Sequence, residues 1–177
     1  MRKQIVFLTS LLLTLTALAA CQDKSQKPSP PAHAQCKFSD GKTLTIDYSS
    51  PRAKGRKIFG GLVPYGEVWR TGANEATSLV TDANLNVGGK DVPAGHYTIF
   101  TVPNADKWTL IISKKTGEWG IPYKYEGDEL GRVDMKVSST PSAVENFTIA
   151  LSPMGGGCTL NLSWENTQAS VDLSEKK

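Results

Sequence analysis

The sequence predicts an all-β domain: an antiparallel β-sandwich or flattened barrel of about eight or nine short strands with one long irregular loop. Three observations support this fold class. Apolar and polar residues alternate with a period of two over most of the chain after residue 36, as in strands with one buried face. Gly, Pro, Asn and Asp separate the short apolar runs, and no useful helical periodicity appears. Short strands and frequent turns of this kind are typical of sandwiches and barrels.

The first 20 residues read as a secretory signal peptide. Arg2 and Lys3 form a charged start, and residues 5–18 are an apolar run that is too short to span a bilayer. Small residues then precede Cys21, in a pattern that resembles the bacterial lipobox. We therefore expect cleavage before Cys21 and acylation of its thiol and amine, so that several acyl chains hold the protein on a membrane.

Residues 21–35 are polar and contain three prolines, which predicts an extended tether behind the lipid anchor. The remaining residues, 36–177, are expected to form a single domain. Gln22 follows the anchor, where an aspartate would mark retention in the inner membrane of enterobacteria. The sequence therefore favours the outer membrane, with the domain in the periplasm.

The expected strands follow one another closely along the domain. Gly88-Gly89 has the composition of a hairpin turn between two of the shortest runs. The runs lie at residues 43–48, 76–82, 85–87, 91–92, 97–102, 108–113, 132–138, 146–151, 159–164 and 169–173.

Three cysteines are present, and removal of the anchor Cys21 leaves Cys36 and Cys158 as an even pair in an oxidising compartment. Cys158 has the same parity as Leu160 and Trp164, so its side chain should face the interior. We predict a disulfide between Cys36 and Cys158.

Composition and missing motifs exclude several functions. Loss of Arg2 and Lys3 with the signal peptide lowers the formal net charge from +3 to +1, which argues against general nucleic-acid binding. His96 is the only histidine of the expected domain, so neither a histidine triad nor a multi-histidine metal site is predicted. We expect no metal, no cofactor and no catalytic residue.

Residues 49–77 form the longest stretch without strand alternation, and loops of this kind commonly carry function. The segment contains a basic cluster within residues 52–57, and the run WRTGANE at residues 69–75 places a guanidinium, a carboxamide and a carboxylate close together. Each group also has a structural interpretation: solvated charges, an Arg70–Glu75 ion pair, a Trp69 that covers the core, and a turn held by Asn74. Our candidate binding residues are Arg56, Lys57, Tyr65, Trp69, Arg70, Asn74 and Glu75.

Several of these motifs resemble the bacterial family called domain of unknown function 2911. They include KGRKIFG at residues 54–60, VPYG at 63–66, WRTGANEAT at 69–77, PAG at 93–95 and LSW at 162–164. The resemblance extends over residues 36–173. The resemblance implies an envelope protein whose domain spans these residues. It implies no activity, because no activity is established for the family.

The leading hypothesis is a lipid-anchored envelope protein that binds a small molecule, a glycan or a protein through the 49–77 loop. One alternative is a structural or assembly partner of another envelope protein. The other is an envelope glycan- or ester-processing enzyme that uses Glu75 and Arg70. Within the loop we expect Asn74 and Glu75 to serve recognition and Trp69 to serve the fold.

Overall fold

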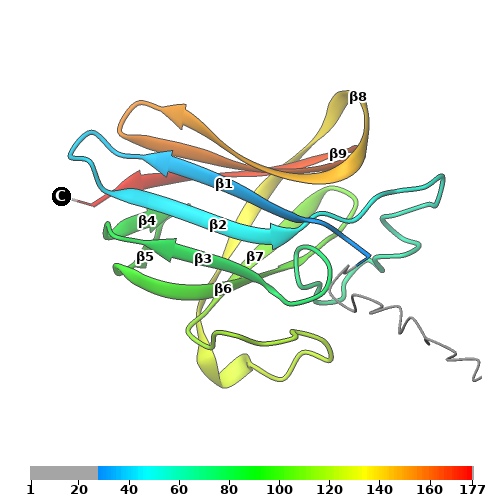
Figure 1. Cartoon of the computed structure of the whole chain (residues 1–177), viewed down its shortest axis with the longest axis horizontal. Helices are drawn as coiled ribbons and strands as arrows, with labels where there is room; N and C mark the ends of the chain where they lie inside the picture. The colour runs from blue at the N-terminus through cyan, green and yellow to red at the C-terminus, as the bar shows by residue number, and fades with distance from the viewer. Residues whose placement is uncertain (1–27, 177) are drawn as a thin grey trace, which may run out of the picture.

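A computed structural model describes residues 28–176, and this part of the chain is an antiparallel all-β domain (Figure 1). The described residues contain no α-helix and one short 3₁₀ helix, η1, at Glu126–Asp128. The nine strands are β1 (Pro31–Lys37), β2 (Thr43–Ser49), β3 (Thr77–Thr81), β4 (Leu85–Val87), β5 (Lys90–Val92), β6 (Gly95–Val102), β7 (Lys107–Ser113), β8 (Glu129–Met154) and β9 (Gly157–Glu175).

All nine strands belong to one hydrogen-bonded sheet in the order β1-β2-β3-β6-β7-β8-β9-β4-β5. Every pairing in it is antiparallel. The sheet does not close into a barrel, because β1 and β5 remain at its two ends. The predicted all-β antiparallel class and the number of strands are confirmed.

The sheet folds over itself, so that the second half of β8 and β9 lie across β1 and β2 (Figure 1). Backbone hydrogen bonds tie β8 to the chain that leaves β2: the amide of Phe147 donates to the carbonyl of Pro51, and the amide of Ala53 donates to the carbonyl of Glu145, each at 2.8 Å. The Tyr48 hydroxyl also accepts a bond of 2.9 Å from the amide of Ile149. These contacts enclose the core between the two halves of the sheet.

Strand alternation fills this core. Successive side chains of a strand point to opposite faces, and in β9 every second residue from Cys158 to Trp164 is buried. Together with apolar residues of β2, β3, β6 and β7 they form one continuous cluster. The inward orientation expected for Cys158 is confirmed.

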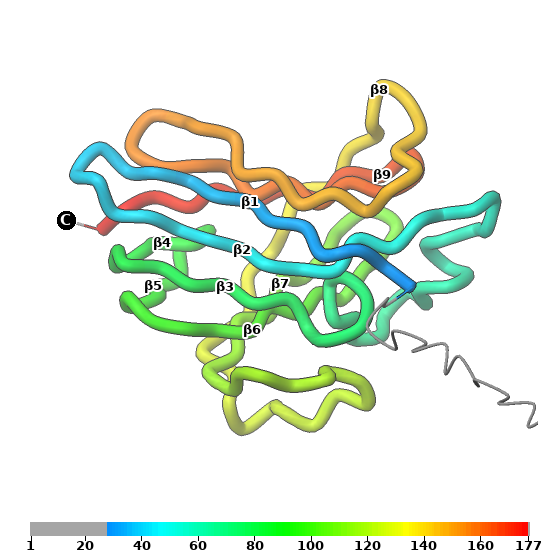
Figure 2. The backbone as a smooth tube through the Cα atoms, viewed as in Figure 1, coloured from blue at the N-terminus to red at the C-terminus, as the bar shows by residue number. Residues whose placement is uncertain are grey.

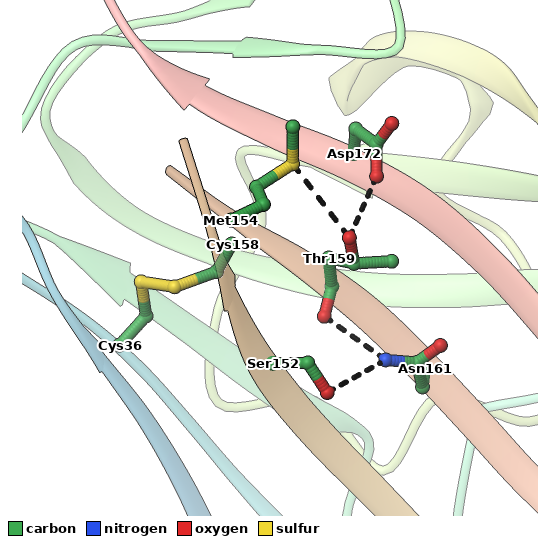
Figure 3. The surroundings of a disulfide bond; sticks show 7 residues. All are labelled: Cys36, Ser152, Met154, Cys158, Thr159, Asn161 and Asp172. Atoms are coloured by element: carbon green, nitrogen blue, oxygen red, sulfur yellow. Dashed lines mark hydrogen bonds between the residues drawn. A yellow bond between two sulfur atoms is a disulfide. The ribbon is translucent and has the colours of Figure 1, made fainter. Parts of the chain in front are cut away.

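The predicted disulfide is present between Cys36 on β1 and Cys158 on β9 (Figure 3). The two Cα atoms are 6.4 Å apart, and the bond closes a sequence separation of 122 residues. Both cysteines are buried. The bridge therefore crosses the core. It links β1 to β9, two strands that are not neighbours in the sheet.

Two expectations about element boundaries are corrected. Residues 31–35, expected in the tether, belong to β1, whose register pairs Pro31 with Ser49 of β2. Only Ala34 and Cys36 of β1 are buried, so small side chains on the inner face hid the strand signal.

The four expected runs at residues 132–138, 146–151, 159–164 and 169–173 form two long strands, β8 and β9. The sequence between the first two runs is polar and contains Pro141, which removes one backbone donor. The structure accommodates it in register shifts between Ser139 and Val144 and between Val144 and Thr148. The polar break is thus an irregular part of β8 and not a loop between strands.

Candidate functional site

The 49–77 loop leaves β2 and returns at β3, and it lies at the end of the molecule where the described chain begins (Figure 2). Its first half is anchored by Ile58, Phe59 and Val63, which are buried. A tight turn brings these residues inward: the amide of Val63 donates to the carbonyl of Ile58 at 2.9 Å, and the amide of Gly60 donates to the carbonyl of Val63 at 2.9 Å. The loop is therefore a folded cap on the core.

Trp69 belongs to an aromatic cluster beneath this cap. Its ring is stacked on Trp164 at a centroid distance of 5.9 Å and meets Phe147 edge-on at 4.8 Å. Phe59 and Trp108 complete the cluster. The indole Nε1 of Trp69 donates to the carbonyl of Gly72 at 3.0 Å. Trp69 thus packs against the core, and its use as a stacking surface for a ligand stays a prediction.

The turn after Trp69 contains two non-glycine residues with left-handed backbone. Thr71 has φ 55° and Asn74 has φ 58°. A β-branched residue rarely adopts this conformation, but Thr71 is fully buried and tightly held. Its carbonyl accepts a bond of 2.7 Å from the Thr77 hydroxyl, and its own hydroxyl lies 3.1 Å from that of Thr101. The surrounding packing imposes this sharp turn.

Asn74 holds the turn to the start of the described chain. Its side-chain Nδ2 donates to the carbonyl of Ser29 at 3.1 Å and to the Ser49 hydroxyl at 3.0 Å. Its backbone carbonyl accepts a bond from the guanidinium of Arg70. These contacts give the carboxamide a role in fixing the loop, and recognition by Asn74 stays a prediction.

Arg70 is half-buried and is positioned by a second loop, residues 114–125. The guanidinium carbon lies 5.1 Å from the centre of the Trp119 ring, and one of its nitrogens donates to the Trp119 carbonyl at 3.3 Å. Burial lowers the pKa of Arg70 below its usual value, and the negative charge of Glu75 raises it. The cation is thus partly desolvated against an aromatic face.

A cavity of about 600 Å³ opens between the two loops. We call it the cationic cavity because the side chains of Arg52, Lys54, Arg56 and Arg70 line it, with Glu67 as the only lining carboxylate among residues 28–176. Apolar side chains contribute much of the remaining wall, including Leu62, Val63, Trp69 and Ile121. The first two described residues, Pro28 and Ser29, also line it.

Three of the four cations of this cavity have no ion pair within 4 Å in the described part of the chain. This holds for Arg52, Lys54 and Arg56, and also for Lys57. Arg56 instead donates to backbone carbonyls of its own turn, to Ala53 at 3.0 Å and to Arg52 at 2.6 Å. Arg56 therefore shapes the turn, whereas Arg52 and Lys54 present their charge to the cavity.

The other candidates lie elsewhere. Glu75 lines a neighbouring cavity of about 730 Å³, whose other acidic side chains are Asp47 and Glu118. Lys57 lines a third, of about 340 Å³. Tyr65 lines none of these three cavities, and its ring covers Gly60, where an added Cβ would lie 2.8 Å from it. Four of the seven candidates thus meet in the cationic cavity, namely Arg56, Trp69, Arg70 and Asn74.

Sequence reasoning missed the contribution of the second loop. Trp119 of this loop has 55% of its surface exposed. Ile121, two residues later, is 38% exposed and lines the cationic cavity. The only signal was a run, residues 114–122, in which apolar residues lack the alternation of a strand.

The described residues contain no group of three or more His, Cys, Asp or Glu side chains arranged to hold a metal ion. Between residues 28 and 176 no helix has the length and apolar character needed to cross a membrane.

Fold and site together define a disulfide-bridged, antiparallel β domain in which two loops frame a cationic cavity. The chain matches the family described as a protein of unknown function, DUF2911, over residues 29–173, and it belongs to that family. The match begins next to β1 and thus agrees with the earlier domain start seen in the structure. Comparisons with curated proteins and with solved structures give no significant match.

Proposed function

We propose that this protein is a lipid-anchored component of the bacterial envelope that binds an anionic ligand in the cationic cavity. The observation that carries the proposal is the excess of positive charge there: among residues 28–176, four cationic side chains and one carboxylate, that of Glu67, line the cavity. Guanidinium and ammonium groups are donors only, so they bind phosphate and carboxylate oxygens well. The volume lies in the range of small-molecule sites.

The envelope setting rests on the sequence. The lipobox-like Cys21 and the preceding signal peptide lie outside the described residues, so they remain a prediction. The buried Cys36–Cys158 disulfide is consistent with an oxidising compartment such as the periplasm. Gln22 supports the outer membrane as the place of the anchor.

Binding can be tested with two soluble probes, glycerol 1-phosphate and glucuronate. We expect both to shift NMR signals of residues around the cavity in the mature chain carrying Cys21→Ala. The double variant Arg52→Gln/Lys54→Gln should weaken binding of both probes. We chose Arg52 and Lys54 because their side chains donate no hydrogen bond to another side chain within residues 28–176.

The matched control removes two cations from the opposite end of the molecule, with Lys37→Gln and Lys42→Gln at the β1–β2 turn. Lys42 pairs there with the exposed Asp40 and with Glu175, whose side chain is only 7% exposed, so thermal unfolding must first show that this control is folded like the parent. The control should bind both probes like the parent chain. Equal weakening in both double variants would show a net-charge effect and contradict a site in the cavity.

The anchor is tested by cell fractionation of Cys21→Ala in the full chain. We expect the protein to move from the membrane to the soluble periplasmic fraction, because no other membrane attachment is proposed. A variant that stays in the membrane pellet would overturn the lipid-anchor assignment or reveal a second attachment.

A protein partner is the second candidate function, and one observation favours it: Leu62 and Ile121 are exposed large apolar residues on the wall of the cavity. Such residues are frequent where proteins associate. The catalytic alternative requires Glu75 and Arg70 to act in one site, but they line different cavities. We therefore do not propose catalysis by this pair.

A further inference from the structure

We infer that the cationic cavity and its apolar rim dock onto the phosphate headgroups of the membrane to which Cys21 anchors the chain. This inference rests on the proposed function and specifies its ligand as a lipid phosphate at a membrane surface. Three independent features support it: the point at which the tether meets the domain, the exposed apolar residues, and the position of the charges.

The tether reaches the domain at the cavity itself. Pro28 and Ser29 line its wall, and Ser29, which also borders the neighbouring cavity, is fixed there because its carbonyl accepts the hydrogen bond from Asn74. Seven residue steps separate Cys21 from Pro28, and an extended chain covers at most about 25 Å in that number of steps. The C-terminal end lies at the opposite end of the long axis (Figure 1). An acylated Cys21 therefore keeps the cavity end of the domain near the bilayer.

Exposed apolar residues gather at the same end. The described residues contain five large exposed hydrophobics, and four of them belong to the two loops that frame the cavity: Leu62, Tyr65, Trp119 and Ile121. Tryptophan and tyrosine favour the headgroup region of a bilayer, where an apolar ring and a polar atom are both accommodated. The fifth, Met154, lies at the β8–β9 turn.

Positive and negative side chains are distributed unequally at the cavity end of the domain. Arg52, Lys54 and Arg56 line the cationic cavity, whereas the neighbouring cavity bears Asp47 and Glu75 together with Glu118. An anionic surface would attract the first cavity and repel the second, so the domain should settle with one defined orientation. With a formal charge of only +1 for the mature chain, attraction must come from this local asymmetry and not from net charge.

The test uses the mature chain with Cys21→Ala and two kinds of vesicle, one of phosphatidylcholine alone and one of equal parts of phosphatidylcholine and phosphatidylglycerol. We expect partitioning onto the phosphatidylglycerol vesicles and release by added salt. Loss of each cation near an anionic surface weakens binding about fivefold, so Arg52→Gln/Lys54→Gln should weaken it about 25-fold. The Lys37→Gln/Lys42→Gln control should partition like the parent.

Orientation is read from Trp119. The other tryptophans, Trp69, Trp108 and Trp164, are buried or half-buried in the aromatic cluster, so an emission change on binding reports mainly on this exposed ring. Its emission should shift to the blue on vesicles and be quenched by brominated lipids. Trp119→Phe should abolish the change.

The outcomes separate the two proposals. Binding of glycerol 1-phosphate in the cavity without partitioning onto vesicles overturns membrane docking and leaves the anionic-ligand proposal standing. Absence of both overturns both. Vesicle binding that both double variants weaken equally, or that leaves Trp119 emission unchanged, overturns docking through this face. Capture by a protein with no effect of vesicles would assign the face to a protein partner instead.

Discussion

Replacement of Asn74 provides the sharpest test of how the 49–77 loop is built. The change Asn74→Ala removes two donated hydrogen bonds, to the Ser29 carbonyl and to the Ser49 hydroxyl. Each such bond contributes about 0.5–1.5 kcal/mol, or about 1–3 kcal/mol for the pair. Alanine must also adopt φ 58°, which costs roughly 1 kcal/mol more than for asparagine. We therefore expect a loss of about 2–4 kcal/mol.

A second variant separates the two contributions. Asn74→Gly also loses both hydrogen bonds, but glycine adopts positive φ without strain. It should therefore be less destabilised than Asn74→Ala, by about 1 kcal/mol. Asn104→Ala is the matched control: Asn104 is exposed in the β6–β7 turn and has neither a positive φ nor a side-chain hydrogen bond within residues 28–176. It should change stability by less than about 0.5 kcal/mol.

Thermal unfolding followed by circular dichroism measures these differences. For a domain of this size 1 kcal/mol corresponds to about 2–4 °C, so Asn74→Ala should melt about 5–15 °C below the parent. A melting temperature equal to that of the parent would show that Asn74 contributes little to the fold and would favour a role in recognition alone. A glycine variant less stable than the alanine variant would refute the role assigned to the left-handed backbone.

Two other predictions concern the core. Replacing both Cys36 and Cys158 by alanine should lower the free energy of unfolding by up to about 5 kcal/mol, because the closed loop is long. Urea unfolding measures the loss, and two cysteines alkylated before reduction in the parent domain would disprove the bridge. Trp69→Ala should cost about 3–5 kcal/mol, since it opens a cavity in the aromatic cluster. Trp69→Phe should cost less, and an alanine variant as stable as the parent would contradict a core role for Trp69.

Most of the fold follows from the sequence because strand alternation and turn residues are local signals. In β9 every second residue from Cys158 to Trp164 is large and apolar or a cysteine, and the pattern alone indicates which face is buried. Two strand boundaries were not predicted because the local signal is weak there. The inner face of β1 holds Ala34 and Cys36, which are too small to mark a strand, and the bulged middle of β8 lacks a regular alternation of apolar and polar residues.

The site was only partly predictable because it is made by contacts between distant segments. Arg70 and Asn74 were identified from their spacing, but the partners that define their roles are Trp119 and Ser29, 49 and 45 residues away. The spacing also suggested that Glu75 and Arg70 share one site. In the structure, however, the turn at Asn74 directs Glu75 to a different cavity. Positive φ at Thr71 and Asn74 shapes the turn between these neighbours, and it is a tertiary effect that no local pattern indicates.

Some residues of the 49–77 loop stabilise the fold and others line the cavity. This difference determines which substitutions can report on binding. Phe59, Trp69 and Thr71 are held by the core, so their replacement would disturb the fold and the cavity together. Arg52 and Lys54 have no described side-chain acceptor, and they line the cavity from the surface. A loss of binding at those two positions with unchanged stability would therefore report on recognition alone, whereas the same loss at Trp69 would not.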